Sequence, residues 1–194
     1  GVNFIDTHHN YHGGHSEAAI GRALKGFKPP RKVVIQTKTP FYREEPMDVF
    51  KRKIDEALEK LGVDCIDYLF FHSMNMQMFR KRIKGFFQLT DWAMKRGVVA
   101  RRGFSSHDTV ENIKQFVDTG EFSAMLVSYN WLNPYVRAAI EYAADAGMGV
   151  SVMNPVGGGA LGVTTKQVLR LLPGAKSSPE VSLRYALATE GVCT

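Results

Sequence analysis

The stretch from Val33 to His72, VVIQTKTPFYREEPMDVFKRKIDEALEKLGVDCIDYLFFH, contains one complete strand–helix–strand unit. It opens with the apolar run Val33–Lys38 and closes with a second apolar run, Ile66–Phe71. Between them, Pro46–Leu61 repeats apolar residues at helical spacing, with proline at its start and Gly62 after its end. Short apolar runs joined by an amphipathic helix are typical of parallel strands that are covered on both faces.

The same alternation continues on both sides of this unit. Further strands are expected at Val2–Asp6, Val99–Ser105, Ala124–Ser128 and Gly149–Met153, with a candidate seventh from Val192. Further helices are expected at Ser16–Leu24 (with Ser16 as N-cap), Gly85–Arg96, Thr109–Thr119, Pro134–Ala146 and Pro179–Ala188. The pattern predicts one α/β domain over residues 1–194, either a doubly wound sheet or a (β/α)8 TIM barrel. Gly13-Gly14-His15 is not G-x-G-x-x-G, which favours the barrel.

Composition narrows the function classes. Hydrophobic residues make up 44% and charged residues 23%, and no apolar run reaches the roughly 20 residues of a membrane span. The net charge of +6 is scattered, so neither a nucleic-acid nor a membrane partner is expected, and the oligomeric state is not indicated. Cys65 and Cys193 cannot form a disulfide framework, so reduced, buried thiols in a cytoplasmic protein are expected. Because residue 1 is glycine, the natural start is expected upstream.

Polar residues stand directly after the apolar runs. Asp6, Lys38 and His72 close the first three, and Tyr11 follows on the first loop. In a barrel, the carboxyl ends of the strands meet at one mouth. A carbonyl that accepts hydride needs a proton on its oxygen, which Tyr11 can donate if the Lys38 cation lowers its pKa. Asp6 can keep Lys38 charged, and His72 can orient the carbonyl by a hydrogen bond.

The motifs around these residues resemble the aldo-keto reductase family, closest to its archaeal and bacterial branch that often carries a C-terminal ferredoxin-like extension. They are Gly1–Tyr11, Gln36–Lys38, Leu69–His72, Gly103–Ser106, Ser128–Asn130 and Met153–Gly157. The resemblance implies a (β/α)8 barrel that is incomplete at both ends of this chain. It also implies reduction of an aldehyde or ketone by NAD(P)H, with NADP favoured over NAD by the resemblance alone. The implied catalytic residues are Asp6, Tyr11, Lys38 and His72.

The resemblance also assigns the cofactor contacts. They are Asp6, Ser105, Ser106, Met153, Asn154, Pro155, Gly157 and Gly158. Three positions depart from the family's usual pattern around the nicotinamide. Ser106 stands in place of asparagine, Leu126 in place of glutamine, and Met153 in place of the aromatic residue that stacks on the ring.

Two other functions stay open at this point. His8, His9, His12 and His15 could form the metal site of a barrel hydrolase, but adjacent side chains such as His8 and His9 diverge on an extended segment. Lining a pocket for a small-molecule carbonyl substrate is therefore the favoured role of these histidines. The altered nicotinamide contacts would alternatively suit a catalytically silent barrel that binds cofactor as a sensor or partner subunit.

Overall fold

The computed structural model describes residues 2–27 and 31–194. The strand order in the sheet follows the chain, β1-β2-β3-β4-β5-β6. The chain divides into two compact units, one up to Ser105 and one from Ser106 onward. Each unit is described by itself.

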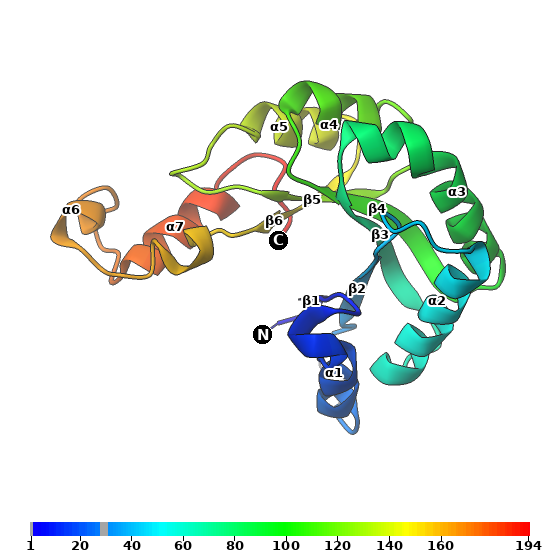
Figure 1. Cartoon of the computed structure of the whole chain (residues 1–194). Coiled ribbons are helices and arrows are strands. Elements are labelled where there is room, and N and C mark those ends of the chain that lie inside the picture. The colour runs from blue at the N-terminus through cyan, green and yellow to red at the C-terminus, as the bar shows by residue number, and fades with distance from the viewer. Residues whose placement is uncertain (1, 28–30) are drawn as a thin grey trace. The chain divides into compact units, whose positions relative to one another are not determined.

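The first unit alternates strands and helices. The strands are β1 (Phe4–Asp6), β2 (Val34–Thr39), β3 (Ile66–Met74) and β4 (Val99–Ser106), whose last residue belongs to the second unit. The helices are α1 (Ser16–Leu24), α2 (Met47–Leu61) and α3 (Met76–Lys95), and they lie on one face of the strands (Figure 1). Parallel pairing sets Asp6 beside Gln36 and Lys38 beside Phe70, so the carboxyl ends of β1 to β3 lie at one edge.

An aromatic cluster holds the helices on this sheet. Phe41, Phe50, Phe71 and Phe86 are all buried, and the ring centroids of Phe41 and Phe50 lie 4.4 Å apart. Burying each ring contributes about 1.5–3 kcal/mol. The helices α1 and α2 approach so closely that a β-carbon at Gly21 would lie 2.1 Å from a carbonyl oxygen of α2. Only glycine permits that contact, which brings both helices against β2.

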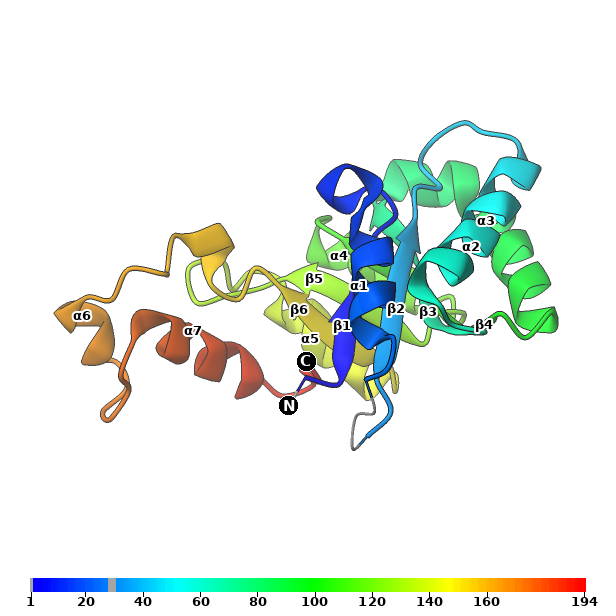
Figure 2. The same cartoon turned by 90° about the horizontal axis from the view of Figure 1, so that it is seen from below.

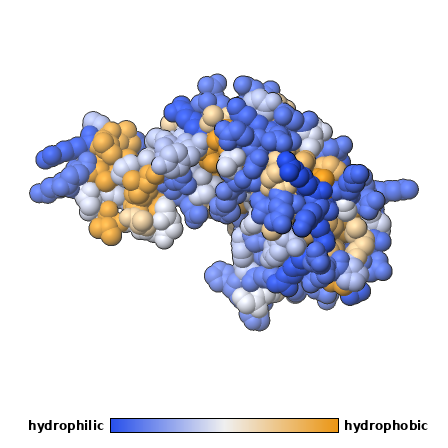
Figure 3. Space-filling model, turned by 45° about the horizontal axis from the view of Figure 1, so that its top comes forward, coloured by the Kyte–Doolittle hydropathy of each residue, from blue (hydrophilic) through white to orange (hydrophobic). Residues whose placement is uncertain are grey.

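The second unit contains β5 (Ala124–Ser128) and β6 (Gly149–Met153), which pair in parallel. Its helices are α4 (Val110–Val117), α5 (Arg137–Asp145), α6 (Lys166–Leu169) and α7 (Ser178–Leu187). In Figure 2, α6 and α7 lie side by side, and the Tyr185 hydroxyl of α7 lies 3.1 Å from the hydroxyl of Tyr129, which directly follows β5. Hydrophobic side chains gather over this pair of helices (Figure 3), where Leu171, Leu183 and Leu187 are exposed.

Most expected elements are confirmed within a few residues, and β5, β6 and α1 match their expected bounds. Helix α3 starts nine residues before Gly85, because the Asn75 side chain accepts a hydrogen bond from the Met78 amide and caps an earlier start. The short helix α6 was not predicted. Val192 forms a single bridge to Val150 rather than a seventh strand.

Two local expectations were wrong. His15, not Ser16, is the N-cap of α1, because the Ser16 hydroxyl is bonded instead to the Thr7 hydroxyl at 2.8 Å. The cysteines are free thiols, but Cys193 is exposed and Cys65 only partly covered, since neither lies inside the packed part of a strand. Among the described helices, none is both long enough and apolar enough to cross a membrane.

Candidate active site

A buried lysine joins the ends of β1 and β2. The Lys38 side chain is 1% exposed, and its Nζ donates to both carboxylate oxygens of Asp6 at 2.6 and 2.7 Å. It also donates to the Thr7 carbonyl at 2.9 Å and lies 3.4 Å from the Tyr11 hydroxyl. Gln36 Nε2 donates to the same carboxylate at 2.6 Å. This network holds the ammonium group at a fixed distance from the phenol.

Tyr11 reaches the lysine from a tight 3-10 turn, Tyr11–Gly14, in the loop after β1. The turn needs left-handed backbone at His12 (φ 52°) and Gly13 (φ 65°). The Tyr11 ring lies 6.2 Å from the His72 ring at the end of β3, in an edge-on arrangement. Tyr11 is 38% exposed, so its hydroxyl is within reach of a ligand. The structure therefore brings together Asp6, Tyr11, Lys38 and His72, as the strand ends predicted.

The pKa of Tyr11 shifts in the opposite direction from the one expected. Burial raises the pKa of Tyr11 and the Asp6 carboxylate raises it further, whereas the sequence predicted a lowering by Lys38. The physical reason is that both Asp6 oxygens already neutralise the ammonium group. Burial lowers the pKa of Lys38, and its contact with Asp6 opposes that change. The phenol therefore keeps its proton at neutral pH, which is the form that a proton donor needs.

His8 completes the cluster of rings. It is buried, and its ring centroid lies 4.2 Å from that of His72 and 5.2 Å from that of Tyr11. Burial, and next the charge of His72, lower the pKa of His8 to about 3. Its Nδ1 accepts a hydrogen bond from the Asn10 amide at 3.2 Å, so a neutral ring carries its proton on Nε2. The sequence placed His8 only among pocket-lining histidines, since its burial depends on β3.

The histidines do not support the hydrolase alternative. Within the part of the chain that the structure describes, no group of three or more His, Cys, Asp or Glu side chains is arranged to hold a metal ion. The rings of His8 and His9 meet edge to face with centroids 4.8 Å apart, while His12 and His15 are exposed.

We expect His8→Phe to make folding less sensitive to acid. The folded pKa of about 3 lies below the unfolded value of 6.5, so the unfolded chain binds the proton first and stability falls as the pH drops below 6.5. Between pH 7 and pH 5 this group removes about 2 kcal/mol of unfolding free energy. Urea unfolding at pH 7 and pH 5 should show a smaller loss of unfolding free energy in His8→Phe than in the wild type. His107→Phe, which changes an exposed ring, should keep the wild-type difference, and an unchanged difference in His8→Phe would refute the assignment.

The residues assigned to the cofactor fall in both units. In the first, the Ser105 hydroxyl accepts a hydrogen bond from the Ser73 amide at 2.9 Å, next to His72. In the second, the Ser106 hydroxyl accepts from the Asp108 amide at 3.1 Å. The remaining assigned residues form the end of β6 and the exposed turn after it: Met153, Asn154, Pro155, Gly157 and Gly158.

The turn after β6 fits a bulky anionic cofactor. Gly157, Gly158 and Gly159 have φ of 61°, 63° and 99°, and a β-carbon at Gly158 or Gly159 would meet nothing within 4 Å. Bare backbone of this kind lets a phosphate-bearing ligand approach the main chain. Met153, at the end of β6, offers a polarisable side chain that can pack on a flat ring.

Comparison with known proteins finds one matching family and several similar relatives. A family model described as "Aldo/keto reductase family" matches residues 1–194. An NADH-specific methylglyoxal reductase of Escherichia coli (strain K12) is 25% identical over 179 residues, which are 83% of this chain and 54% of that protein. An L-galactose dehydrogenase of Arabidopsis thaliana is 36% identical over 78 residues, covering 38% of this chain and 24% of that protein.

A solved structure supports the fold. The holo form of aldo-keto reductase AKR11C1 from Bacillus halodurans superposes with a TM-score of 0.80 at 23% identity, covering 99% of this chain and 70% of that one. The fold is thus an incomplete (β/α)8 barrel, as the sequence predicted, with strands arranged in chain order. The chain spans about half the length of the curated methylglyoxal reductase that it matches.

Proposed function

The chain belongs to the aldo/keto reductase family, and on this premise we propose that the whole protein reduces a small aldehyde or ketone to an alcohol with a nicotinamide cofactor. The observation that carries the proposal is the 3.4 Å contact between the Tyr11 hydroxyl and the Lys38 ammonium group, which Asp6 holds in place. A protonated phenol beside a fixed cation, with the His72 ring 6.2 Å from the phenol ring, suits proton transfer to a carbonyl oxygen.

In this mechanism Tyr11 donates the proton and His72 orients the substrate. The reduced nicotinamide supplies hydride when bound. The carbonyl oxygen accepts the Tyr11 proton as negative charge develops on it, and a hydrogen bond from His72 fixes its position. The Lys38 ammonium group lies next to the oxygen that loses the proton and can donate a hydrogen bond to it. Asp6 keeps that ammonium group protonated and pointed at the phenol.

The family resemblance assigns cofactor contacts within each unit. Within the first unit these are Asp6 and Ser105, and within the second they are Ser106, Met153, Asn154, Pro155, Gly157 and Gly158. Family resemblance favours NADP, whereas the name of the Escherichia coli relative points to NADH. A reducing compartment such as the cytoplasm is proposed because both cysteines are free thiols.

Fluorescence titration with NADPH and with NADH, followed by an assay with methylglyoxal, tests the proposal. We expect saturable binding of at least one cofactor and oxidation of that cofactor only when an aldehyde is present. The relative's name makes methylglyoxal a reasonable first substrate. Tight binding without turnover on any of a panel of aldehydes and ketones would favour the silent cofactor-binding barrel instead. Binding of neither cofactor would reject the proposal.

A further inference from the structure

The backbone directly after His72 has an unusual conformation. Ser73, the next residue of β3, has a φ of 53°, in the left-handed region that residues other than glycine rarely adopt. Among the described residues other than glycine, only His12 and Asn154 share this feature. Each of the three stands directly after a residue assigned to the catalytic or the cofactor site. Strained backbone persists only where the surrounding structure enforces it, and it concentrates at functional sites.

A hydrogen bond from β4 enforces this conformation. The Ser73 amide donates to the Ser105 hydroxyl oxygen at 2.9 Å. Ser105 lies near the end of β4 and is only 2% exposed, so water has little access to its hydroxyl group. The amide belongs to the rigid peptide plane that joins His72 to Ser73. The hydrogen bond therefore fixes the two rotations that set the direction of this plane, which are ψ of His72 and φ of Ser73.

The left-handed residue also explains how the chain passes the site. The pairing of β2 with β3 reaches Phe71, where β2 ends, so His72 extends beyond that edge. Phe71 and Met74 are both fully buried. The turn at Ser73 lets the chain present the His72 ring at the edge of the sheet and still return Met74 to the core.

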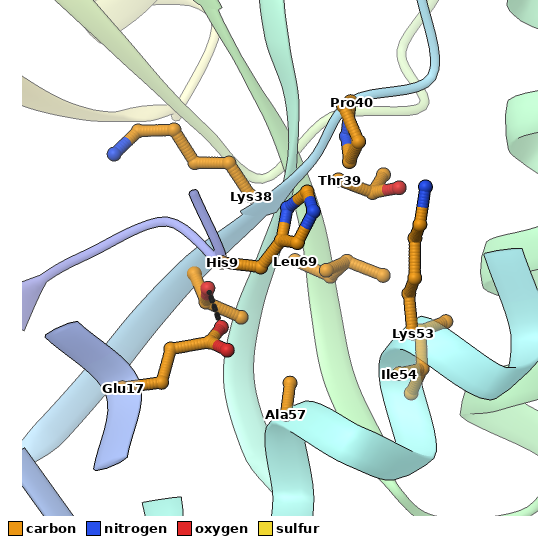
Figure 4. Close-up of a pocket in the computed structure, with 10 residues that line it drawn as sticks. His9, Glu17, Lys38, Thr39, Pro40, Lys53, Ile54, Ala57 and Leu69 are labelled. Atoms are coloured by element: carbon orange, nitrogen blue, oxygen red, sulfur yellow. Dashed lines mark hydrogen bonds between the residues drawn. The ribbon is translucent and has the colours of Figure 1, made fainter. Parts of the chain in front are cut away.

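Lys38, another residue of the proposed site, is held at its charged end. In Figure 4 its side chain points away from Ile54 of α2, and Asp6 binds its ammonium group at 2.6 and 2.7 Å. The His72 ring lies 6.2 Å from the Tyr11 ring, between their centroids. A small rotation of the His72 backbone would change the distance from the imidazole to a carbonyl group bound beside Tyr11.

We propose that Ser105 and Ser73 are positioning residues for His72. The Ser105 hydroxyl holds Ser73 in the left-handed conformation, and through the peptide plane between Ser73 and His72 it fixes the direction of the imidazole. This role adds to the cofactor contact assigned to Ser105, because a hydroxyl that accepts one hydrogen bond keeps its own proton to donate. The effect on turnover rests on the proposed function, whereas the effect on the His72 ring does not.

Nuclear magnetic resonance of Ser105→Ala and Ser105→Thr tests the effect on the ring without any turnover. Alanine removes the acceptor, whereas threonine keeps it. We expect Ser105→Ala to lose the protection of the Ser73 amide against hydrogen exchange and to shift the ring resonances of His72, and Ser105→Thr to restore both. Ser151→Ala removes another buried strand hydroxyl, one that accepts from the Thr194 hydroxyl at 3.2 Å, and should leave both signals as in the wild type. Unchanged His72 resonances in Ser105→Ala would overturn the proposal.

The pair Ser73→Val and Ser73→Gly tests the effect on the reaction. Both variants keep the amide, but a β-branched residue is strongly disfavoured at a φ of 53°, whereas glycine adopts it freely. We expect kcat/KM for a carbonyl substrate to fall by up to about 10²-fold in Ser73→Val, as a displaced orienting group can cause, and to recover in Ser73→Gly. The dissociation constant of the cofactor should stay the same in both variants, since no cofactor contact is assigned to Ser73.

A purely structural role would give a different result. Ser73→Val would then have a lower midpoint of thermal unfolding but the kcat/KM of the wild type, and this outcome would overturn the proposal. If Ser73→Val does not fold, the resonances of the two Ser105 variants decide. A wild type that binds cofactor but reduces no carbonyl compound would count against the reductase function, while the shift of the His72 resonances in Ser105→Ala would still support the positioning of the ring.

Discussion

Replacing Tyr11 by phenylalanine is expected to lower kcat for carbonyl reduction by a factor of about 10²–10⁴, the usual contribution of a general acid. The substitution removes one oxygen and leaves the ring, so its contacts with His8 and His72 remain. The lost group is the one that lies 3.4 Å from Lys38 Nζ. The dissociation constant of the cofactor should change little, since no cofactor contact is assigned to Tyr11.

Steady-state kinetics and cofactor titration on the same preparations check this result. Tyr42→Phe is a matched control, because Tyr42 also contacts the His72 ring, at 6.0 Å, but has no assigned role in proton transfer. We expect Tyr42→Phe to keep kcat within a small factor of the wild type. A Tyr11→Phe protein that turns over as fast as the wild type would remove the phenol from the mechanism.

Replacing Asp6 by asparagine is expected to lower the free energy of unfolding by about 3 kcal/mol at pH 7. The change leaves the buried ammonium group of Lys38 without its counter-charge, and breaking a buried pair in this way typically costs about 3–5 kcal/mol. The lower end applies because the Asp6 side chain is 32% exposed and solvent weakens the pair. Activity should fall as well, because Lys38 then loses its proton more easily.

The pH dependence of this loss provides a further check. Burial lowers the folded pKa of Lys38 below its ordinary 10.5, and removal of Asp6 lowers it further. When the folded pKa of a lysine lies below its unfolded pKa, the free energy of unfolding rises with pH between the two values. The loss of unfolding free energy in Asp6→Asn, relative to the wild type, should therefore shrink between pH 7 and pH 10.5. Asp55→Asn, which breaks an exposed pair with Arg96, should cost at most about 1 kcal/mol. Equal losses in the two variants would contradict the account of the Asp6–Lys38 pair.

Much of the fold follows from periodicity. The runs at β5 and β6 are apolar and bounded by polar or turn residues, so their ends were predicted correctly. The start of α3 was missed because the charged stretch from Arg80 to Lys84 obscures the helical period, and the capping role of Asn75 is clear only from its hydrogen bond to the Met78 amide. The N-cap at His15 could not be predicted either, because the Ser16 hydroxyl shares a hydrogen bond with the Thr7 hydroxyl instead of capping the helix.

The candidate site, like the fold, could be predicted from the sequence only in part. Asp6, Lys38 and His72 could be grouped from the sequence, because each lies at or near the carboxyl end of a strand and parallel strands end at one edge. The direction of the Tyr11 pKa shift could not be predicted, since it depends on burial and on the way Asp6 holds Lys38. The burial of His8 likewise depends on the position of β3 in space. Local patterns carry no information on either quantity.

Single-turnover transfer of deuterium tests the central claim most directly. The protein is loaded with nicotinamide cofactor that carries deuterium at the transferable position, and one equivalent of aldehyde is added. We predict one deuterium on the former carbonyl carbon of the alcohol for each cofactor oxidised, at a rate that drops by about 10²–10⁴ in Tyr11→Phe. Alcohol without deuterium, or the same transfer rate in Tyr11→Phe, would contradict the account.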